Sequence, residues 1–273
     1  MSQEVESIIL RAKEDIYTLL QGGNFSKYLG HGYDFSELRA YDSGDDIRAI
    51  SWINSAKLGE LYVKKMHEER ELNISIAMLL DGRAIIGNKI ETMNYILTLI
   101  SYSSLHTNNL LKISYLFGDI FKSFEPTKRF EDVEGVLKEF REKEPLELKI
   151  AYEKVEERLI NSIESKSLLF IVGDFFEFID LSILSQKHEL VIIVVRDRWE
   201  ENPKVTPNSE LVNPLNSRVL TQTLSKKSVD YYKKRLQEHD EKLFEHFNHC
   251  GVKYIKVYDF NEVINKLETL FEY

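Results

Sequence analysis

Cysteine is nearly absent from this chain of 273 residues, which holds a single one, Cys250. No disulfide can therefore form within the chain, and this suits a reducing compartment. An excess of positive charge is also missing, because the formal net charge is −9. That balance argues against a nucleic-acid-binding protein, whose phosphate-binding surface needs clustered lysines and arginines, although a local basic patch remains compatible with it.

Long hydrophobic runs are missing as well. The chain starts Met1-Ser2-Gln3-Glu4-Val5-Glu6, which has neither the basic start nor the apolar stretch of a signal peptide. The longest apolar runs, 74–80 and 190–195, are far too short to span a bilayer. We therefore predict a cytoplasmic protein that does not insert into membranes.

The apolar content is high enough for a sizeable core, since 43% of the residues are hydrophobic and 11% are aromatic. The length fits one large domain, or one domain with a substantial extra segment. Over residues 4–20 the apolar positions follow i, i+3, i+4 spacing, which predicts an amphipathic helix. Residues 24–72 show no clear period, and we expect loops with short strands there.

From residue 73 onward, apolar runs typical of strands alternate with segments of helical period. The predicted strands cover 74–80, 111–117, 121–124, 168–172, 190–195 and 254–257. The predicted helices cover 90–100, 133–140, 152–163, 178–187, 228–248 and 263–270, with a loop or irregular hairpin at 200–226. The alternation predicts an α/β fold with a mostly parallel sheet of five or six strands and helices on both faces.

The strands ending at Leu80, Val172 and Val195 are continuous apolar runs, so we expect them side by side in the interior of the sheet. Ligands of such sheets bind at the carboxyl ends of the strands. The residues at those ends are Asp81, Asp174 and Asp197.

A distinctive motif runs from Gly32 to Trp52. Its most characteristic members are Arg39, Tyr41, Gly44, Asp45, Asp46, Arg48 and Trp52. It continues through Ser55-Ala56-Lys57, Val63-Lys64 and Glu69-Arg70. The motif closely resembles the family called "domain of unknown function 58", whose members carry Arg-x-Tyr-x-x-Gly-Asp-Asp-x-Arg-x-Ile-Asp-Trp before a von Willebrand factor A-like domain. The chain departs from it at Ser51, where the family usually has Asp, and at Lys57, where it usually has Arg.

The resemblance covers roughly residues 4–270 and implies two parts. Residues 1–72 would hold the N-terminal helix and the motif, and residues 73–273 would form the von Willebrand factor A-like domain. Members of the family are typically encoded beside MoxR-type AAA+ ATPases and are thought to act with them in the maturation or assembly of other proteins. The resemblance therefore implies a MoxR-type ATPase and a client protein as partners.

Asp42, Asp45 and Asp46 interleave with Arg39 and Arg48, and two interpretations of this pattern stay open. One is a charged docking surface. The other is an ion-paired segment, anchored by Tyr41 and Trp52, that holds the N-terminal part on the main domain.

The resemblance also implies a metal site. Von Willebrand factor A domains often bind Mg²⁺ through Asp-x-Ser-x-Ser after the first strand, a later Thr and an Asp after the fourth strand, because this cation prefers oxygen ligands. Here the first motif reads Asp81-Gly82-Arg83-Ala84-Ile85, Asp174 matches the distant Asp, and Thr127 is the candidate for the Thr. Since both serines are replaced, we expect a degenerate site in which Arg83 neutralises Asp81 or Asp174, and no metal or other cofactor.

His239, His246 and Cys250 fall on one stripe of the predicted helix 228–248 and its end. A single helix spreads them over about 16 Å, too far for one zinc ion, so we interpret them as structural. The sequence also holds no Gly-x-Ser-x-Gly and no P-loop.

The resemblance, together with the missing catalytic motifs, implies a non-enzymatic adaptor or chaperone-accessory protein that acts through protein–protein contacts. The alternative is a metal-dependent hydrolase, or a Mg²⁺-dependent ligand-binding A domain, that uses Asp81 and Asp174. A third reading is an interaction module without an ATPase partner.

Overall fold

The computed structural model of the protein describes residues 7, 10–13, 15, 35–66, 72–204, 211–220 and 225–271. Its centre is a six-stranded sheet of order β10-β7-β6-β3-β4-β5. The strands are β3 (Asn73–Leu80), β4 (Leu110–Phe117), β5 (Ile120–Ser123), β6 (Leu168–Gly173), β7 (Glu189–Val195) and β10 (Lys253–Val257). All neighbouring pairs are parallel except β4 and β5, which form an antiparallel hairpin at one edge.

The expected neighbourhood of the strands ending at Leu80, Val172 and Val195 is confirmed, because β3, β6 and β7 lie next to one another inside the sheet. Their residues are buried almost without interruption, as strands covered on both faces must be. Counted in chain order within this sheet, the strands run 3-2-1-4-5-6, so the order reverses between β3 and β6. In a doubly wound sheet this switch point is where the loops part and leave a crevice for ligands.

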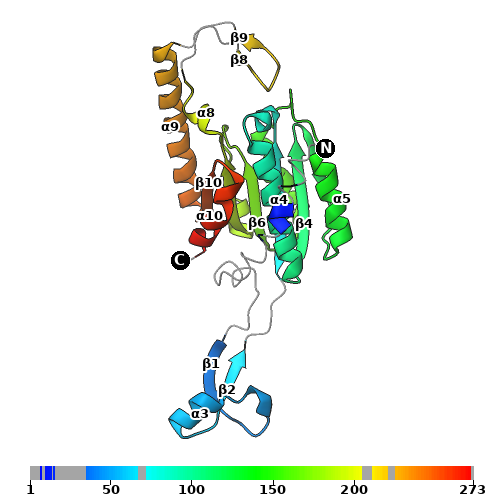
Figure 1. The fold of residues 1–273 in the computed structure, drawn as a ribbon, viewed down its shortest axis with the longest axis vertical. Helices are drawn as coiled ribbons and strands as arrows, with labels where there is room; N and C mark the ends of the chain where they lie inside the picture. The colour runs from blue at the N-terminus through cyan, green and yellow to red at the C-terminus, as the bar shows by residue number, and fades with distance from the viewer. Residues whose placement is uncertain are drawn as a thin grey trace.

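Helices cover both faces of the sheet (Figure 1). One core contains apolar residues of α4 (Lys89–His106), α5 (Phe130–Arg141) and α10 (Val263–Leu270). The opposite core contains residues of α6 (Val155–Ser162), α7 (Leu184–Lys187) and α9 (Lys226–His249). The two apolar layers on either side explain why the central strands carry no polar–apolar alternation.

The predicted helix over residues 4–20 lies largely outside the described residues. Those of its residues that are described are helical, and Ala12 is fully buried in the core that contains α4. The Tyr95 hydroxyl of α4 donates to Asp15 at 2.6 Å, and Lys13 bonds Glu134 of α5. This part of the chain therefore packs on the outer side of α4 and α5.

The family motif forms a small unit of its own. It contains the antiparallel strands β1 (Phe35–Ala40) and β2 (Tyr62–Met66), the short helix η1 (Ile47–Ala49) and the helix α3 (Trp52–Leu58). Figure 1 draws this unit apart from the six-stranded sheet. The strands agree with the expectation for residues 24–72, but α3 was not expected.

Other boundaries also differ from the sequence prediction. The helix predicted at 178–187 is only α7, of four residues. The segment 200–226 agrees with the prediction of a loop or irregular hairpin, because its described residues contain the hairpin β8 (Leu211–Val212) and β9 (Val219–Leu220). The four-residue helix α8 (Arg198–Glu201) precedes it, where Asp197 and Glu200 form a capping box. Three further short helices are η2 (Gly82–Ile85), η3 (Tyr152–Lys154) and η4 (Phe260–Glu262).

Candidate functional site

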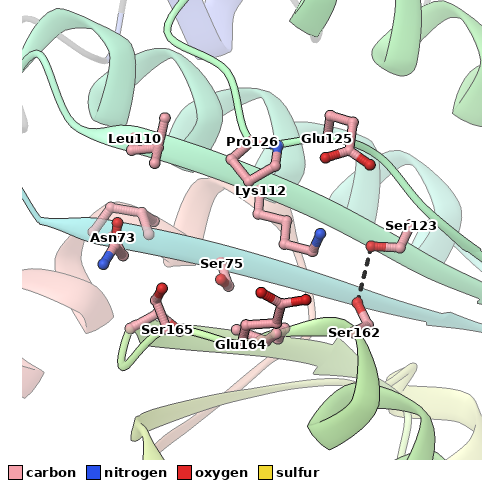
Figure 2. Close-up of a pocket in the computed structure, with 13 residues that line it drawn as sticks. Asn73, Ser75, Leu110, Lys112, Ser123, Glu125, Pro126, Ser162, Glu164 and Ser165 are labelled. Carbon is pink, nitrogen blue, oxygen red and sulfur yellow. Dashed lines mark hydrogen bonds between the residues drawn. The ribbon is translucent and has the colours of Figure 1, made fainter.

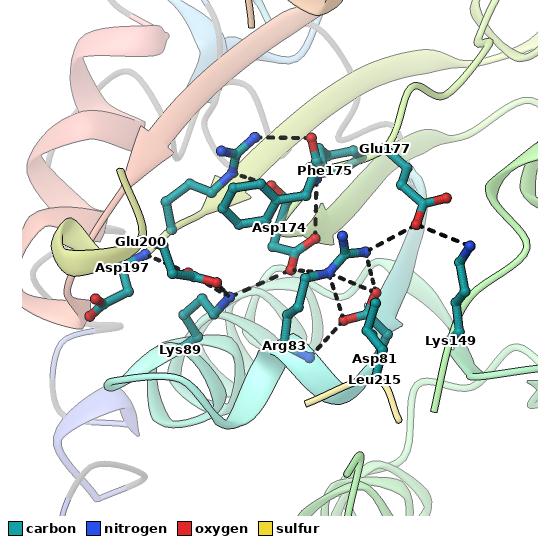
Figure 3. A network of polar contacts seen from close by, with 12 residues as sticks. Asp81, Arg83, Lys89, Lys149, Asp174, Phe175, Glu177, Asp197, Glu200 and Leu215 are labelled. Carbon is teal, nitrogen blue, oxygen red and sulfur yellow. Dashed lines mark hydrogen bonds and ion pairs between the residues drawn. The ribbon is translucent and has the colours of Figure 1, made fainter. Parts of the chain in front are cut away.

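Asp81 and Asp174 lie side by side at the switch point of the sheet, directly after β3 and β6 (Figure 3). The guanidinium of Arg83 lies between them. Its Nε atom is 3.2 and 3.1 Å from the two carboxylate oxygens of Asp81 and 3.3 Å from Oδ2 of Asp174. The expected contact of Arg83 with one carboxylate is therefore present, and it extends to both.

The loop after β3 has the shape needed to bring Arg83 back to the strand ends. The Asp81 side chain accepts a bond from the backbone N–H of Arg83 at 2.9 Å and so starts the short helix η2. At Gly82 a Cβ atom would lie 2.0 Å from the carbonyl oxygen of Pro214, so only glycine fits there. The segment around Pro214 consequently covers the loop from outside.

A second group of charges supports the first. Lys89 is almost fully buried and lies 3.5 Å from Oδ2 of Asp174 and 2.7 Å from Oε2 of Glu200. Arg196 is also fully buried and donates to the carbonyl oxygens of Asp174 and Phe175, the latter at 2.9 Å. Both cations thus bond to the chain around Asp174 in a region that is shielded from solvent.

Sequence reasoning missed Lys89, Arg196 and Glu200. Arg196 follows the last residue of β7, so the rule that selected the strand-end aspartates could have selected it. Lys89 is the first residue of α4, and Glu200 lies within α8. Because the two are far apart in the sequence, no local pattern joins them.

Groups of opposite charge are paired throughout this cluster. Arg83 contacts Asp81, Asp174 and Glu177, Lys89 contacts Asp174 and Glu200, and Arg196 contacts Asp240 at 3.1 Å. The outermost pair, Lys149 and Glu177, is 3.6 Å apart. Such pairing is what allows charges to be buried at all.

The two central carboxyl groups respond differently to burial. Burial and the neighbouring charge of Asp174 raise the pKa of Asp81, against the opposing effect of Arg83. Burial also acts to raise the pKa of Asp174, but the charges of Arg83, Lys89 and Arg196 outweigh it and the pKa is lowered. Asp174 is therefore the ionised centre of the cluster.

These residues do not fit a Mg²⁺ ion. Arg83 fills the space between the two carboxylates with a permanent positive charge, and Ile85, in the place of the second serine, is half exposed and has no lone pair to offer. Within the described part of the chain, no three His, Cys, Asp or Glu residues gather as a metal-binding group.

Thr127 does not belong to this site, and its assignment to the metal-site group was wrong. It pairs with Leu111 near the start of β4, whereas the carboxyl edge of β4 is at Phe117. Its hydroxyl donates to Asp132 at 2.6 Å. The mistake arose because the sequence alone did not show which residue corresponds to the Thr of metal-binding A domains. At the carboxyl edge of the sheet, the loop that contains Leu148 lies beside Asp81, since the Leu148 carbonyl accepts from the Gly82 N–H.

In the motif unit, Arg39 and Asp45 form a two-bond ion pair, with 2.7 Å between Nη1 and Oδ2. Asp46 accepts from the backbone N–H of Arg48 and caps η1. The Tyr41 backbone N–H bonds the carbonyl of Leu61. Around Gly44, an added Cβ would meet open space.

Of the two interpretations of the motif, the ion-paired segment used Trp52 as an anchor, and Trp52 does not serve as one, because 64% of its surface is exposed. The buried residue of α3 is Ser55, whose hydroxyl accepts from the backbone N–H of Tyr62 at 2.8 Å. The anchor of α3 is thus a hydrogen bond rather than an aromatic ring.

The stripe of His239, His246 and Cys250 is engaged in structural bonds. His239 Nε2 lies 2.9 Å from the carbonyl of Phe175, and His246 Nε2 accepts from the Leu181 N–H at 3.0 Å. Cys250 Sγ lies 3.7 Å from the same His246 nitrogen. With that lone pair already committed to an amide, His246 is not set up as a metal ligand.

The strand order, the antiparallel edge strand and the helices on both faces define a von Willebrand factor A-like α/β domain. Residues 37–242 match the family described as "Protein of unknown function DUF58", and the chain belongs to that family. Among curated proteins none matches the chain.

Two solved structures are similar at low identity. One is the conserved hypothetical protein BatB from Bacteroides thetaiotaomicron, at 12% identity and a TM-score of 0.43, with 73% of this chain and 96% of that chain covered. The other is an aerotolerance-related membrane protein from Bacteroides fragilis NCTC 9343 with multiple mutations to serines, at 10% identity and a TM-score of 0.46, with 73% and 98% covered. In this chain, none of the described helices is long and apolar enough to cross a membrane.

Proposed function

We propose that the protein is a non-enzymatic adaptor that binds other proteins through its von Willebrand factor A-like domain without a metal ion. The observation that carries the proposal is the position of Arg83 between Asp81 and Asp174. A guanidinium there supplies the positive charge that a cation supplies in metal-binding A domains. The metal-dependent hydrolase has less support, because the same guanidinium fills the position its metal would need.

The proposed partners are a MoxR-type AAA+ ATPase and a client protein, in the cytoplasm. Membership of the family supports the ATPase as a partner, because members are typically encoded beside MoxR-type ATPases. The single cysteine supports a reducing compartment. In this proposal the chain binds and orients the client protein, and the ATPase supplies the energy by hydrolysing ATP.

We assign the binding of the ATPase to the surface of the motif unit. Its exposed apolar side chains are Ile47, Trp52, Ile53, Leu58 and Leu61. Tryptophan is enriched where protein interfaces have their strongest contacts, and exposed apolar side chains grouped on a small unit mark an interaction surface. The Arg39–Asp45 pair would then hold the backbone of this surface in shape rather than contact the partner itself.

Co-expression with a MoxR-type ATPase from the same organism, followed by crosslinking in each nucleotide state, tests the proposal. We expect a complex in at least one state, and we expect Trp52→Ala with Ile53→Ser to weaken it by about tenfold. Ile183→Ser, which removes an exposed apolar side chain elsewhere, is the control. A complex in no nucleotide state would reject the ATPase as partner.

A further inference from the structure

Beside the Asp81–Arg83–Asp174 cluster, the surface holds an apolar groove of about 490 Å³. Its walls come from α8, the β8–β9 hairpin and the first turns of α9, which Figure 1 shows at one end of the molecule. The residues used below are Trp199, Val212, Pro214, Val229 and Tyr232, with Arg83 at the inner end. The groove thus lies at the same sheet edge as the proposed metal-free site.

Large apolar side chains in the groove are exposed to solvent. Trp199 is 45% exposed and Val212 is 56% exposed. On the far side of Tyr232, Tyr231 and Arg235 line an adjoining hollow. Tryptophan, tyrosine and arginine together are the residue types most enriched at the centres of protein interfaces.

The first turns of α9 are strongly basic in a chain whose net charge is −9. Residues 226–235 carry five cations and one acid, Asp230, which gives +5 − 1 = +4. The first turn holds Lys226 and Lys227 and no acidic residue. A helix N-terminus is already positive, so lysines there are unfavourable unless something negative lies nearby.

The helix geometry places part of this positive charge beside the groove. At 100° per residue, Val229 and Tyr232 share the face that lines the groove, Lys226 and Lys233 lie on one flank of that face, and Arg235 lies on the other. Ser225 caps the helix without supplying a negative charge. An apolar groove bordered by cations on both flanks is complementary to an acidic segment that carries a large apolar side chain.

We propose that this groove binds an acidic peptide segment of a partner protein, which inserts one large apolar side chain between Trp199, Val212 and Tyr232. The inference rests on the proposed role in protein binding but not on the identity of the ATPase. It names the chemistry of the bound segment: carboxylates for the cations of α9, and a leucine or aromatic anchor for the groove.

Fluorescence anisotropy with the full chain tests this directly. The probe is a labelled peptide of Asp and Glu residues around a central Leu-Phe pair. Two comparison peptides replace either the Leu-Phe pair by serines or the acids by lysines. A labelled oligo-dT is the third comparison, because basic and aromatic residues together also suit single-stranded nucleic acid.

We expect saturable binding of the acidic Leu-Phe peptide that weakens with added salt. Val212→Asp and Trp199→Ala should each reduce the affinity by about tenfold or more, because both side chains are exposed and their loss leaves the core intact. Lys226→Glu with Arg235→Glu should also reduce it by about tenfold. Circular dichroism verifies that each variant remains folded.

Two matched controls should bind like the unmodified protein. Lys138→Glu with Lys166→Glu changes the net charge by the same amount on other exposed surfaces, and Ile183→Ser removes an exposed apolar side chain near the start of β7. Absence of peptide binding, equal binding of the serine peptide, unchanged affinity of the groove variants, or displacement of the peptide by oligo-dT would each overturn the proposal. Peptide binding without any ATPase complex would support the groove as a peptide site and reject the ATPase as a partner. An ATPase complex without peptide binding would support the ATPase and reject the groove as a peptide site.

Discussion

The two edges of the central sheet at which its parallel strands end and begin bury polar groups in different ways. At the carboxyl edge, Asp81, Arg83 and Asp174 are closely paired and largely buried. At the amino edge, a pocket of about 340 Å³ is lined by five serines and also by Asn73, Lys112, Glu125 and Glu164, of which the two glutamates are exposed (Figure 2). There Ser123 lies 2.9 Å from both Ser114 and Ser162.

The comparison shows that buried charge asks for more explanation than a cavity lined by serines and exposed glutamates. Hydroxyl groups cost little to bury once each has a hydrogen bond, and charged groups at the surface stay hydrated. Buried charges are tolerated only with partners, so a paired cluster at the switch point of the sheet is a candidate site. The following expectations are ordered from the largest effect to the smallest.

Removing Arg83 should have the largest effect on stability. In Arg83→Ala, Asp81 and Asp174 face each other without the cation between them, and we expect a loss of about 3–5 kcal/mol in the free energy of unfolding. Chemical denaturation measures it. The control is Arg129→Ala, whose partner Asp132 lies at the surface, so that its loss should cost far less. Equal losses for both variants would contradict the contrast between the two kinds of pair.

The amino edge should respond to acid through His188. Burial, together with the charge of Lys187, lowers the pKa of His188 to about 4, and its Nδ1 accepts from the backbone of Ser167. The unfolded chain, with a pKa of 6.5, therefore binds the proton first as the pH falls. The stability that this group contributes is complete above pH 6.5 and is lost between pH 6.5 and 4, by at most about 1.4 kcal/mol per pH unit.

Denaturation at a series of pH values tests this, with His188→Asn as the comparison. Asparagine keeps an acceptor for the Ser167 N–H but does not titrate, so its stability should vary less between pH 6.5 and 4. An identical pH dependence in both proteins would exclude His188 as the cause.

Hydroxyl removal at the amino edge should have the smallest effect. Ser123→Ala breaks two hydroxyl contacts in a partly buried site, and we expect a loss of about 1 kcal/mol. Ser165→Ala changes an exposed serine of the same pocket and should stay within about 0.5 kcal/mol of the unmodified protein. A loss above about 3 kcal/mol in Ser123→Ala would mean that this edge resembles the charged one.

The sheet could be predicted well because its interior strands are unbroken apolar runs. The runs ending at Leu80, Val172 and Val195 indicated buried parallel strands, and this predicted that they lie side by side in the interior of the sheet. The helix α3 could not be predicted, since its one buried residue is Ser55 and it shows no apolar period. A four-residue helix such as α7 is too short to show any period at all.

The candidate site was predictable in part for similar reasons. Strand ends fix the positions of Asp81 and Asp174, and the two-residue separation fixes Arg83 near Asp81. Lys89 and Glu200 meet Asp174 only through the tertiary packing of α4 and α8, which leaves no signal in local sequence. In the motif unit, α3 is likewise held by a bond between elements, from the backbone N–H of Tyr62 to the Ser55 hydroxyl.

The central claim is that the guanidinium of Arg83 takes the place of a metal ion between Asp81 and Asp174. Isothermal titration calorimetry of the full chain with Mg²⁺ and with Mn²⁺ tests it most directly, beside the variant Arg83→Ser with Ile85→Ser. We expect no saturable binding to the unmodified protein and a measurable gain of affinity in the double variant, because it restores two hydroxyl ligands and removes the competing charge. Saturable binding to the unmodified protein that disappears in Asp81→Ala would contradict the claim.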